Sequence, residues 1–434
     1  MDAFLIEGGR PLRGSVEVRG AKNAALPMMA AALLMDEGKL VLRRVPNLAD
    51  IKSMVLVLQQ LGVRVDRRGH EMTLQVVSEK NCRAPYELVS KMRASVCVLG
   101  PLVGKRRQAE VSMPGGCSIG DRPIDLHLKG LAALGASVAV ERGYVIASAR
   151  RLAGNSMYLG GPFGSTVTGT ENVLMAAVLA PGTTVIECAA CEPEVQEVAR
   201  LLVRMGARID GIGSPRLTVH GVRKLRGCTF DIIPDRIEAG TFMAAAAITG
   251  GDVSIERVDP GHLMCVTECL KQAGAHIETG PDWIRVIGNG MFRPVSVATL
   301  PYPGFPTDMQ AQFMALMTRG EGISIITERI YPERFHHVPE FGRMGANIRR
   351  EGPSAIVIGT KELSGAPVMA SDLRAAAGLL VAALAARGET LLQRVYHLDR
   401  GYDQIEQRLE ALGARIRRVD LKPESRSSPL REAV

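Results

Sequence analysis

Apolar and polar positions along this chain repeat in a unit of roughly 70 residues. Each unit contains a helix with one apolar stripe, such as Leu128, Leu131 and Leu134, and a glycine directly after it. A glycine in this place adopts the left-handed conformation that ends a helix, and a strand of alternating residues follows. These glycines recur 73, 71, 68, 71 and 68 residues apart, at Gly62, Gly135, Gly206, Gly274, Gly345 and Gly413. The even spacing predicts six internal repeats.

A second kind of helix is predicted earlier in every unit. These segments are rich in Ala and Met, apolar nearly all round, and span residues 24–34, 92–103, 171–179, 240–248, 309–317 and 375–385. A helix without a polar face must be buried on all sides. We therefore expect these helices to pack centrally, with strands and amphipathic helices outside them. The strand at residues 3–8 precedes the first unit and is expected to complete a sheet elsewhere.

The length of the chain favours two lobes of three units each. A single hydrophobic core rarely serves as many as 434 residues. The chain is 46% hydrophobic and 23% charged, which is typical of soluble globular proteins. The first residues lack the apolar region of a signal peptide, and the longest apolar run, residues 375–386, is too short to cross a bilayer. We expect a cytoplasmic protein without a membrane contact, and a disordered tail over residues 420–434.

The net charge of +8 favours an anionic partner. The chain has no dense basic run and no aromatic pairs of the kind that bind single strands, so nucleic acid is not expected, and small phosphorylated molecules are favoured. The eight cysteines form no disulfide framework, and no histidine shows metal-ligand spacing. Phosphate-binding and dinucleotide-binding glycine loops are also missing from the sequence. We expect no metal and no cofactor.

Polar residues stand at the start of each buried helix. Asp235 and Asp372 are ordinary helix caps or parts of a site, and these two interpretations remain open. Capping does not explain Lys22, Arg236 and Arg374, or Arg93 in the second unit, because the helix dipole disfavours a cation there. A bound anion would offset both charges. These helix starts therefore predict an anion site.

Two further stretches have a composition suited to chemistry. The loop Pro114-Gly-Gly-Cys117-Ser-Ile-Gly-Asp-Arg122-Pro presents a cysteine near an arginine and a helix start, which would favour its thiolate. An inert loop cysteine is the alternative. Two prolines before Asp308 fix the approach of this acid to a buried helix, which suits a general base; a helix cap is the alternative.

The chain resembles the UDP-N-acetylglucosamine (UDP-GlcNAc) enolpyruvyl transferases. The matching stretches span residues 1 to about 416 in order: Gly20-Ala-Lys22-Asn23-Ala-Ala-Leu-Pro27, Lys91-Met-Arg93-Ala-Ser, the Cys117 loop, Pro234-Asp-Arg-Ile-Glu238-Ala-Gly-Thr, Phe305-Pro-Thr-Asp308-Met-Gln-Ala-Gln, Arg334-Phe, Asp372-Leu-Arg374-Ala and His397-Leu-Asp-Arg400-Gly-Tyr. The resemblance implies an α/β fold called an inside-out α/β barrel, with two lobes, each of three βαβαββ units around buried parallel helices. Lobe I would comprise residues 1–21 and 234–434, and lobe II residues 22–233, which carry the Cys117 loop.

The resemblance also implies a reaction. The enolpyruvyl group of phosphoenolpyruvate is transferred to the 3′-hydroxyl of UDP-GlcNAc through a tetrahedral intermediate, with release of phosphate, as the first committed step of peptidoglycan synthesis. Asp308 is then the expected base for the hydroxyl, and Cys117 the expected proton donor and the target of fosfomycin. Lys22 and Arg400 complete the expected catalytic set. Lobe closure around the substrates would use Arg334 and Arg374.

The expected substrate contacts follow from the same motifs. Phosphoenolpyruvate would be bound by Lys22, Asn23, Arg122 and Arg400. UDP-GlcNAc would be bound by Asn23, Arg93, Arg122, Pro123, Ile124, Asp125, Leu126, Gly164, Ser165, Thr166, Val167, Asp308 and Ile330. The chain departs from many relatives at residues 166–170, and Gly164 stands where some have lysine. We therefore expect weaker or re-routed contacts to the UDP phosphates.

Two other functions are compatible with parts of the sequence. A sister enzyme of the same fold transfers enolpyruvyl to shikimate 3-phosphate, but it normally has Lys-Ser in place of Lys22-Asn23 and lacks the cysteine loop. A silent paralogue that only senses nucleotide sugars is the second alternative. Because Cys117, Asp308, Lys22 and Arg400 occur together, the sequence favours the transferase.

Overall fold

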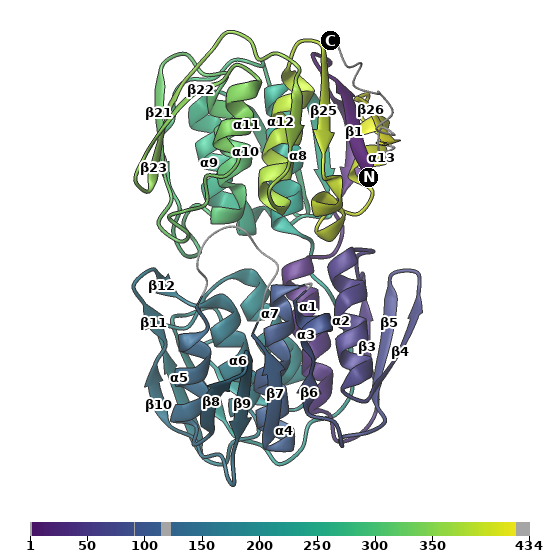
Figure 1. The fold of residues 1–434 in the computed structure, drawn as a ribbon, viewed down its shortest axis with the longest axis vertical. Coiled ribbons are helices and arrows are strands. Elements are labelled where there is room, and N and C mark those ends of the chain that lie inside the picture. Colours follow the sequence, from purple (N-terminus) through teal and green to yellow (C-terminus); the bar gives the residue numbers. More distant parts are fainter. Residues whose placement is uncertain (1, 91, 114–122, 422–434) are drawn as a thin grey trace, which may run out of the picture.

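The computed structural model describes residues 2–90, 92–113 and 123–421. Its apolar side chains form two separate cores. One core is built from residues between 21 and 232, and the other from residues between 4 and 18 together with residues between 237 and 416. Figure 1 shows the two corresponding halves one above the other. We use lobe II and lobe I for these halves; that their boundaries fall at residues 21 and 233 stays a prediction.

A largely buried helical segment forms the centre of each repeat, as the apolar pattern predicts. These segments are α1 (Lys22–Ala31), η2 (Arg93–Val98) continued by α4 (Leu99–Arg106), α6 (Val167–Ala177), α8 (Arg236–Ile248), η4 (Thr307–Met309) continued by α10 (Gln310–Met317), and α12 (Leu373–Ala385). In α8 and α12 nearly every residue is buried, including the charged Arg236 and Arg374. Buried cations of this kind require partners, which the site provides.

A more exposed helix follows in each repeat and ends at the predicted glycine. These helices are α2 (Ala49–Gln60), α5 (Asp125–Ala133), α7 (Pro193–Arg204), α9 (Met264–Ala273), α11 (Val338–Arg343) and α13 (Ile405–Ala411). All six glycines have a positive φ, between 82° at Gly62 and 112° at Gly206. The helix-ending role predicted for them is confirmed.

Each repeat also supplies a four-stranded sheet with one parallel and two antiparallel pairings. In lobe II the strand orders are β16 (Thr229–Asp231), β3 (Leu40–Arg43), β5 (Glu71–Val76), β4 (Val63–Arg68); β6 (Arg83–Ala84), β7 (Gln108–Ser112), β9 (Tyr144–Ser148), β8 (Ser137–Glu141); and β10 (Ser156–Tyr158), β13 (Thr183–Glu187), β15 (Arg216–His220), β14 (Arg208–Asp210). In lobe I they are β18 (His276–Thr279), β19 (Trp283–Ile287), β17 (Asp252–Glu256), β2 (Arg13–Glu17); β20 (Val297–Ala298), β21 (Ile323–Thr327), β23 (Ser354–Ile358), β22 (Asn347–Glu351); and β24 (Pro367–Met369), β25 (Glu389–Gln393), β1 (Asp2–Glu7), β26 (Arg415–Asp420).

These sheets confirm the predicted α/β fold of six repeats. Within the described residues the sheets of a lobe stay separate around the buried helices and do not join into one hydrogen-bonded barrel. The smaller segments are the hairpin β11 (Gly160–Gly161) and β12 (Gly164–Ser165), helix α3 (Tyr86–Val89) and the 3₁₀ turns η1 (Ala32–Leu34), η3 (Pro260–Leu263) and η5 (Val395–Arg400). No helix in the described residues is both long and apolar enough to span a membrane.

The first strand completes a sheet elsewhere, as expected. Strand β1 lies between β25 and β26 of the last repeat, where Figure 1 shows the purple strand beside the yellow ones. Strands β2 and β16 also occupy exchanged places: each precedes a buried helix of one lobe but pairs in the other. The chain therefore crosses between lobes twice. The crossings run side by side, because the Ala21 amide donates to Ile233 O (2.7 Å) and the Asp235 amide to Arg19 O (2.8 Å).

Close packing of α4 on α6 leads to a stability prediction. A Cβ added at Gly100 would lie 2.1 Å from the backbone oxygen of Asn172, so Gly100→Ala forces two buried helices apart. We expect a loss of about 1–3 kcal/mol in the free energy of unfolding. Gly342→Ala is the matched control, since outside its own helical turn no other atom lies within 4 Å of that Cβ. Chemical denaturation of both variants tests this, and equal unfolding midpoints would refute the packing argument.

Candidate active site

Asp308 lies between two buried arginines where the lobes face each other. Its Oδ1 accepts from Arg334 Nη1 and its Oδ2 from Arg374 Nη2, both at 2.9 Å. The arginine side chains are 7% and 5% exposed, whereas that of Asp308 is 26% exposed. The carboxylate caps no helix in the structure. The cap alternative for Asp308 is therefore wrong, and its free face is open to a substrate.

The charges around Asp308 set its protonation. Burial alone would raise the pKa of this carboxyl, but Arg374 and Arg334 hold it well below its ordinary value. Asp308 is therefore ionised at neutral pH and poorly basic while both arginines grip it. A base works best when its pKa is near the operating pH. For Asp308 to take a proton efficiently, an arriving anion would have to attract one or both arginines.

A second cluster connects the lobes through Asp50. This buried carboxylate accepts from Lys22 Nζ at 3.1 Å and from Arg400 Nε at 2.9 Å. Burial lowers the pKa of Lys22, and the attraction of Asp50 opposes that shift. Arg374 and Arg400 repel the same ammonium. Lys22 and Arg400 thus share one carboxylate, and this excess of positive charge makes a site suited to a multiply charged anion.

A third contact between the lobes lies beside these clusters. Arg236 at the start of α8 forms a two-fold ion pair with Glu194 of α7, with Nε–Oε1 at 3.0 Å and Nη2–Oε2 at 3.2 Å. The Tyr302 amide donates to Glu192 at 3.3 Å, and the Arg236 guanidinium lies 5.6 Å from the Tyr302 ring centre. These contacts bring the loop before Asp308 against lobe II.

The cations at the helix starts therefore find protein carboxylates in this structure. Lys22 contacts Asp50, Arg236 contacts Glu194, and Arg374 contacts Asp308. The sequence predicted cations there but named no protein partner. Asp235 and Asp372 cap α8 and α12 through two backbone amides each, so both are helix caps. Asp235 also accepts from the Lys22 amide at 3.3 Å, and a further part of either residue in the site stays a prediction.

Several residues expected to bind UDP-GlcNAc come together in another part of lobe II. Buried His127 contacts Thr168 Oγ1 at 3.0 Å, and its pKa is lowered to about 4 by burial and then by the charge of Arg93. A Cβ at Gly161 would meet Leu126 at 3.1 Å, which places hairpin β11–β12 against the start of α5. Arg93, the 125–126 segment and the 164–168 segment are thus neighbours. Their contact with a nucleotide stays a prediction.

Gly164 has a structural reason to be glycine. Its φ is +94°, and a Cβ there would lie 2.9 Å from Pro301 Cγ of lobe I. The hairpin therefore approaches the other lobe where some relatives carry a lysine. Thr166 caps α6 by accepting from the Gly169 amide at 3.3 Å. A lysine at position 164 would be strained in this arrangement, so its substitution would test backbone geometry together with charge.

Several predicted residues are less well defined by contacts. Cys117 and Arg122 lie outside the described residues. Asn23 is exposed at the start of α1, and Ile330 is half-buried after β21. The Ile330 amide donates to Glu328 at 2.9 Å. The site also contains Asp50, Glu328 and Tyr402, which sequence reasoning missed. Tyr402 stands in the matched His397–Tyr402 stretch, but no pattern in the sequence links the other two to distant arginines.

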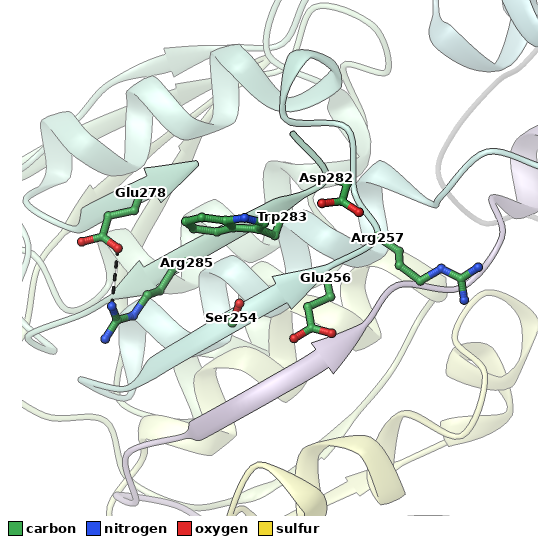
Figure 2. A pocket seen from close by; sticks show the side chains of 7 residues that line it. All are labelled: Ser254, Glu256, Arg257, Glu278, Asp282, Trp283 and Arg285. Carbon is green, nitrogen blue, oxygen red and sulfur yellow. Dashed lines mark hydrogen bonds and ion pairs between the residues drawn. The ribbon is translucent and has the colours of Figure 1, made fainter. Parts of the chain in front are cut away.

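One surface hollow lies away from these clusters. It measures about 460 Å³ and is lined by Ser254, Glu256, Arg257, Glu278, Asp282, Trp283 and Arg285 on the outer face of the sheet that contains β17, β18 and β19 (Figure 2). Arg285 is already held by Asp252 through two hydrogen bonds of 2.9 Å and contacts Glu278. None of the predicted site residues lines it. This hollow therefore does not help to assign a reaction to the protein.

Two kinds of comparison agree with this architecture. The chain matches the family of EPSP synthase (3-phosphoshikimate 1-carboxyvinyltransferase) over residues 6–409, and it therefore belongs to that family. Two solved structures share the fold. The enolpyruvyl transferase NikO from Streptomyces tendae has a TM-score of 0.86 at 24% identity, covering 96% of this chain and 98% of its own. EPSP synthase from Acinetobacter baumannii has a TM-score of 0.73 at 19% identity, covering 97% and 100%.

Curated relatives are much more similar in sequence. The UDP-N-acetylglucosamine 1-carboxyvinyltransferase of Desulfosudis oleivorans is 54% identical, covering 96% of this chain and 100% of its own length. The protein of the same name from Koribacter versatilis is 52% identical, covering 99% of each. Within the EPSP synthase family, the chain therefore groups with relatives of that name, which is the resemblance that its motifs indicated.

Proposed function

We propose that this protein is a UDP-N-acetylglucosamine 1-carboxyvinyltransferase, which transfers the enolpyruvyl group of phosphoenolpyruvate to the 3′-hydroxyl of UDP-GlcNAc. The observation that carries the proposal is the pair of neighbouring clusters between the lobes: Asp308 between two arginines, and Lys22 with Arg400 around Asp50. One cluster supplies a carboxylate base and the other a concentration of positive charge. Transfer of an enolpyruvyl group from a multiply charged donor requires both.

In the proposed reaction, the substrate anion replaces protein carboxylates as the partner of the cations. Lys22, Arg122 and Arg400 bind the phosphate and carboxylate of phosphoenolpyruvate. Asp308 takes the proton of the sugar hydroxyl, and Cys117 gives a proton to the methylene carbon. The hydroxyl oxygen bonds to the central carbon, which gives the tetrahedral intermediate. One proton of the methyl group then returns to the Cys117 sulfur, the C–O bond to phosphate breaks, and the double bond re-forms, so the product is an enol ether and free phosphate. Preorganised cations stabilise the charge that develops.

The lobes are proposed to close over the substrates. Residues 22–233 would move as one body against residues 1–21 and 234–421, with Arg334 and Arg374 drawn toward the anion. Closure would exclude water from the intermediate. UDP-GlcNAc would lie against Arg93, the segment from Pro123 to Leu126, the segment from Gly164 to Val167, and Ile330. The place of action would be the cytoplasm, at the first committed step of peptidoglycan synthesis.

Phosphate release from purified protein tests the proposal directly. We expect release with phosphoenolpyruvate plus UDP-GlcNAc, and none when shikimate 3-phosphate replaces the nucleotide sugar. Incubation with fosfomycin is expected to stop the reaction and to add its mass to the Cys117 peptide. Activity only with shikimate 3-phosphate would overturn the substrate assignment. Binding of UDP-GlcNAc without any phosphate release would favour a silent paralogue.

A further inference from the structure

We propose that Glu328 is a positioning residue for the reaction: its buried carboxylate orients the Thr307 hydroxyl and thereby fixes Arg334 against Asp308. The inference rests on the proposed function, in which Asp308 is the base. Glu328 follows strand β21 and is not among the residues expected to bind a substrate. It acts through Thr307 and Arg334, and a hydrogen bond joins each of these residues to the next.

Glu328 is fully buried and accepts four hydrogen bonds. Its Oε1 accepts from the Thr299 hydroxyl and from the amides of Ile330 (2.9 Å) and Tyr331 (3.0 Å). Its Oε2 accepts from the Thr307 hydroxyl at 2.8 Å. All four partners are donors, which is the set that an ionised carboxylate requires. One side chain thus ties the end of β20, the loop after β21 and the residue preceding Asp308.

The Thr307 hydroxyl makes the contact directional. Arg334 Nη1 donates to Thr307 Oγ1 at 2.9 Å, and a guanidinium can only donate. The single hydroxyl proton must therefore point away from Arg334, toward Glu328 Oε2. A carboxylate accepts that proton and leaves a lone pair of Thr307 facing the arginine. The polarity of this hydrogen bond is fixed by the charge of Glu328.

The same nitrogen of Arg334 completes the path. Nη1 donates both to Thr307 Oγ1 and to Asp308 Oδ1, each at 2.9 Å. Thr307 thus holds Arg334 in the position from which it grips Asp308. A loss of this support would loosen the contact on one carboxylate oxygen, while Arg374 keeps the other. Glu328 therefore controls how strongly the proposed base is held and where its free face points.

Glu328→Gln tests the polarity without a change of size. The amide oxygen of glutamine can still accept from Thr299, Ile330 and Tyr331, which leaves the NH₂ group facing Thr307. Two donors, the amide and Arg334, would then face one hydroxyl oxygen, whose own proton has no acceptor. We expect kcat to fall at least about tenfold, as for loss of one charge-assisted hydrogen bond. The KM for UDP-GlcNAc should change less than about threefold, because the Ile330 contact is kept.

The pH profile separates positioning from a plain charge effect. Removal of the negative charge of Glu328 would by itself lower the pKa of Asp308 and move the acid limb of kcat/KM to lower pH. Release of Arg334 would raise that pKa and move the limb to higher pH, so the sign decides. Thr307→Val removes the hydroxyl with no change of charge and should move the limb in the same direction. The double variant should be no slower than the slower single variant.

The controls make each outcome decisive. Thr327→Val alters a threonine one residue before Glu328, whose hydroxyl contacts Ser354 instead, and should behave as wild type. An unchanged acid limb in both Glu328→Gln and Thr307→Val, with wild-type activity present, would overturn the inference. Inactive wild-type protein would instead refute the proposed function. If Glu328→Gln does not fold, the acid limb of Thr307→Val alone decides. If both single variants fold, additive losses of kcat in the double variant would contradict a path shared by Glu328 and Thr307.

Discussion

Asp308→Asn is expected to lower kcat by roughly a hundredfold to ten-thousandfold, the range for loss of a general base. Asparagine keeps the shape and the hydrogen-bond acceptor but cannot take the proton of the sugar hydroxyl. It also removes the negative charge that forms ion pairs with both Arg334 and Arg374, so the two guanidiniums become more available to an anion. The KM for phosphoenolpyruvate should therefore fall together with kcat. Steady-state kinetics with both substrates varied measures the two effects.

The control for this variant is binding measured without turnover. Calorimetric affinity for UDP-GlcNAc should stay within a few-fold of wild type, and circular dichroism should show a folded protein. Breaking a buried ion pair destabilises proteins by about 3–5 kcal/mol, so the unfolding midpoint should drop and phosphoenolpyruvate should restore part of it. A variant that retains wild-type kcat would eliminate Asp308 as the base. A rise in the KM for phosphoenolpyruvate would contradict the proposed release of the arginines.

Lys22→Met is expected to lower kcat/KM for phosphoenolpyruvate by about a hundredfold, as for loss of one or two charge-assisted hydrogen bonds. Methionine keeps much of the length and the apolar contacts of lysine while removing the ammonium group. Asp50 retains its contact with Arg400 at 2.9 Å, so the link between the lobes is not lost. Lys52→Met, an exposed lysine of α2, is the matched control. An unaltered dependence on phosphoenolpyruvate would exclude Lys22 from its binding site.

The same lysine should produce an alkaline limb in the pH profile. Its pKa is lowered by burial, so the free enzyme loses this cation as the pH rises, at a lower pH than an exposed lysine would. The limb should appear in the pH profile of kcat/KM, which reports the free enzyme. In the profile of kcat it should lie at higher pH, because the bound anion favours the charged form of Lys22. Lys22→Arg cannot lose its proton in this range and should remove the limb. A limb that persists in Lys22→Arg belongs to another group.

Much of the fold is encoded in local patterns. Glycines at helix ends and helices apolar on every face repeat six times, so repeat number, buried helices and the fold class could be predicted from the sequence. Boundaries were less accurate, for local reasons. The segment predicted as a helix over residues 92–103 is divided into η2 and α4, and α6 begins at Val167, earlier than expected, because Thr166 caps it.

The site was only half predictable, because its partners are distant in sequence. Lys22, Arg374 and Asp308 could be selected from the sequence, because they are charged residues at the starts of apolar helices. Asp50 lies 350 residues from Arg400, and its position in the first turn of a more exposed helix suggests nothing beyond a favourable dipole contact. Glu328 likewise appears in the sequence only as an acid after a predicted strand. Its four hydrogen-bond donors are known only from the structure. Sequence patterns thus identify residues that are unusual in their local context, but they do not show which of these residues are in contact in the folded protein.

The side-by-side crossings at Gly20 and Pro234 also bear on how such a protein could be taken apart. Residues 22–233 enter and leave at one point, and strand β16 lies inside that segment with its partner β3. Lobe II is thus topologically an insertion, and the flanking parts of the chain could be joined by a short linker. Excised as a separate polypeptide, residues 22–233 would retain their three four-stranded sheets. Two such fragments, expressed together, would be held partly by the ion pairs Arg400–Asp50 and Arg236–Glu194, so we expect their assembly to weaken as the salt concentration rises.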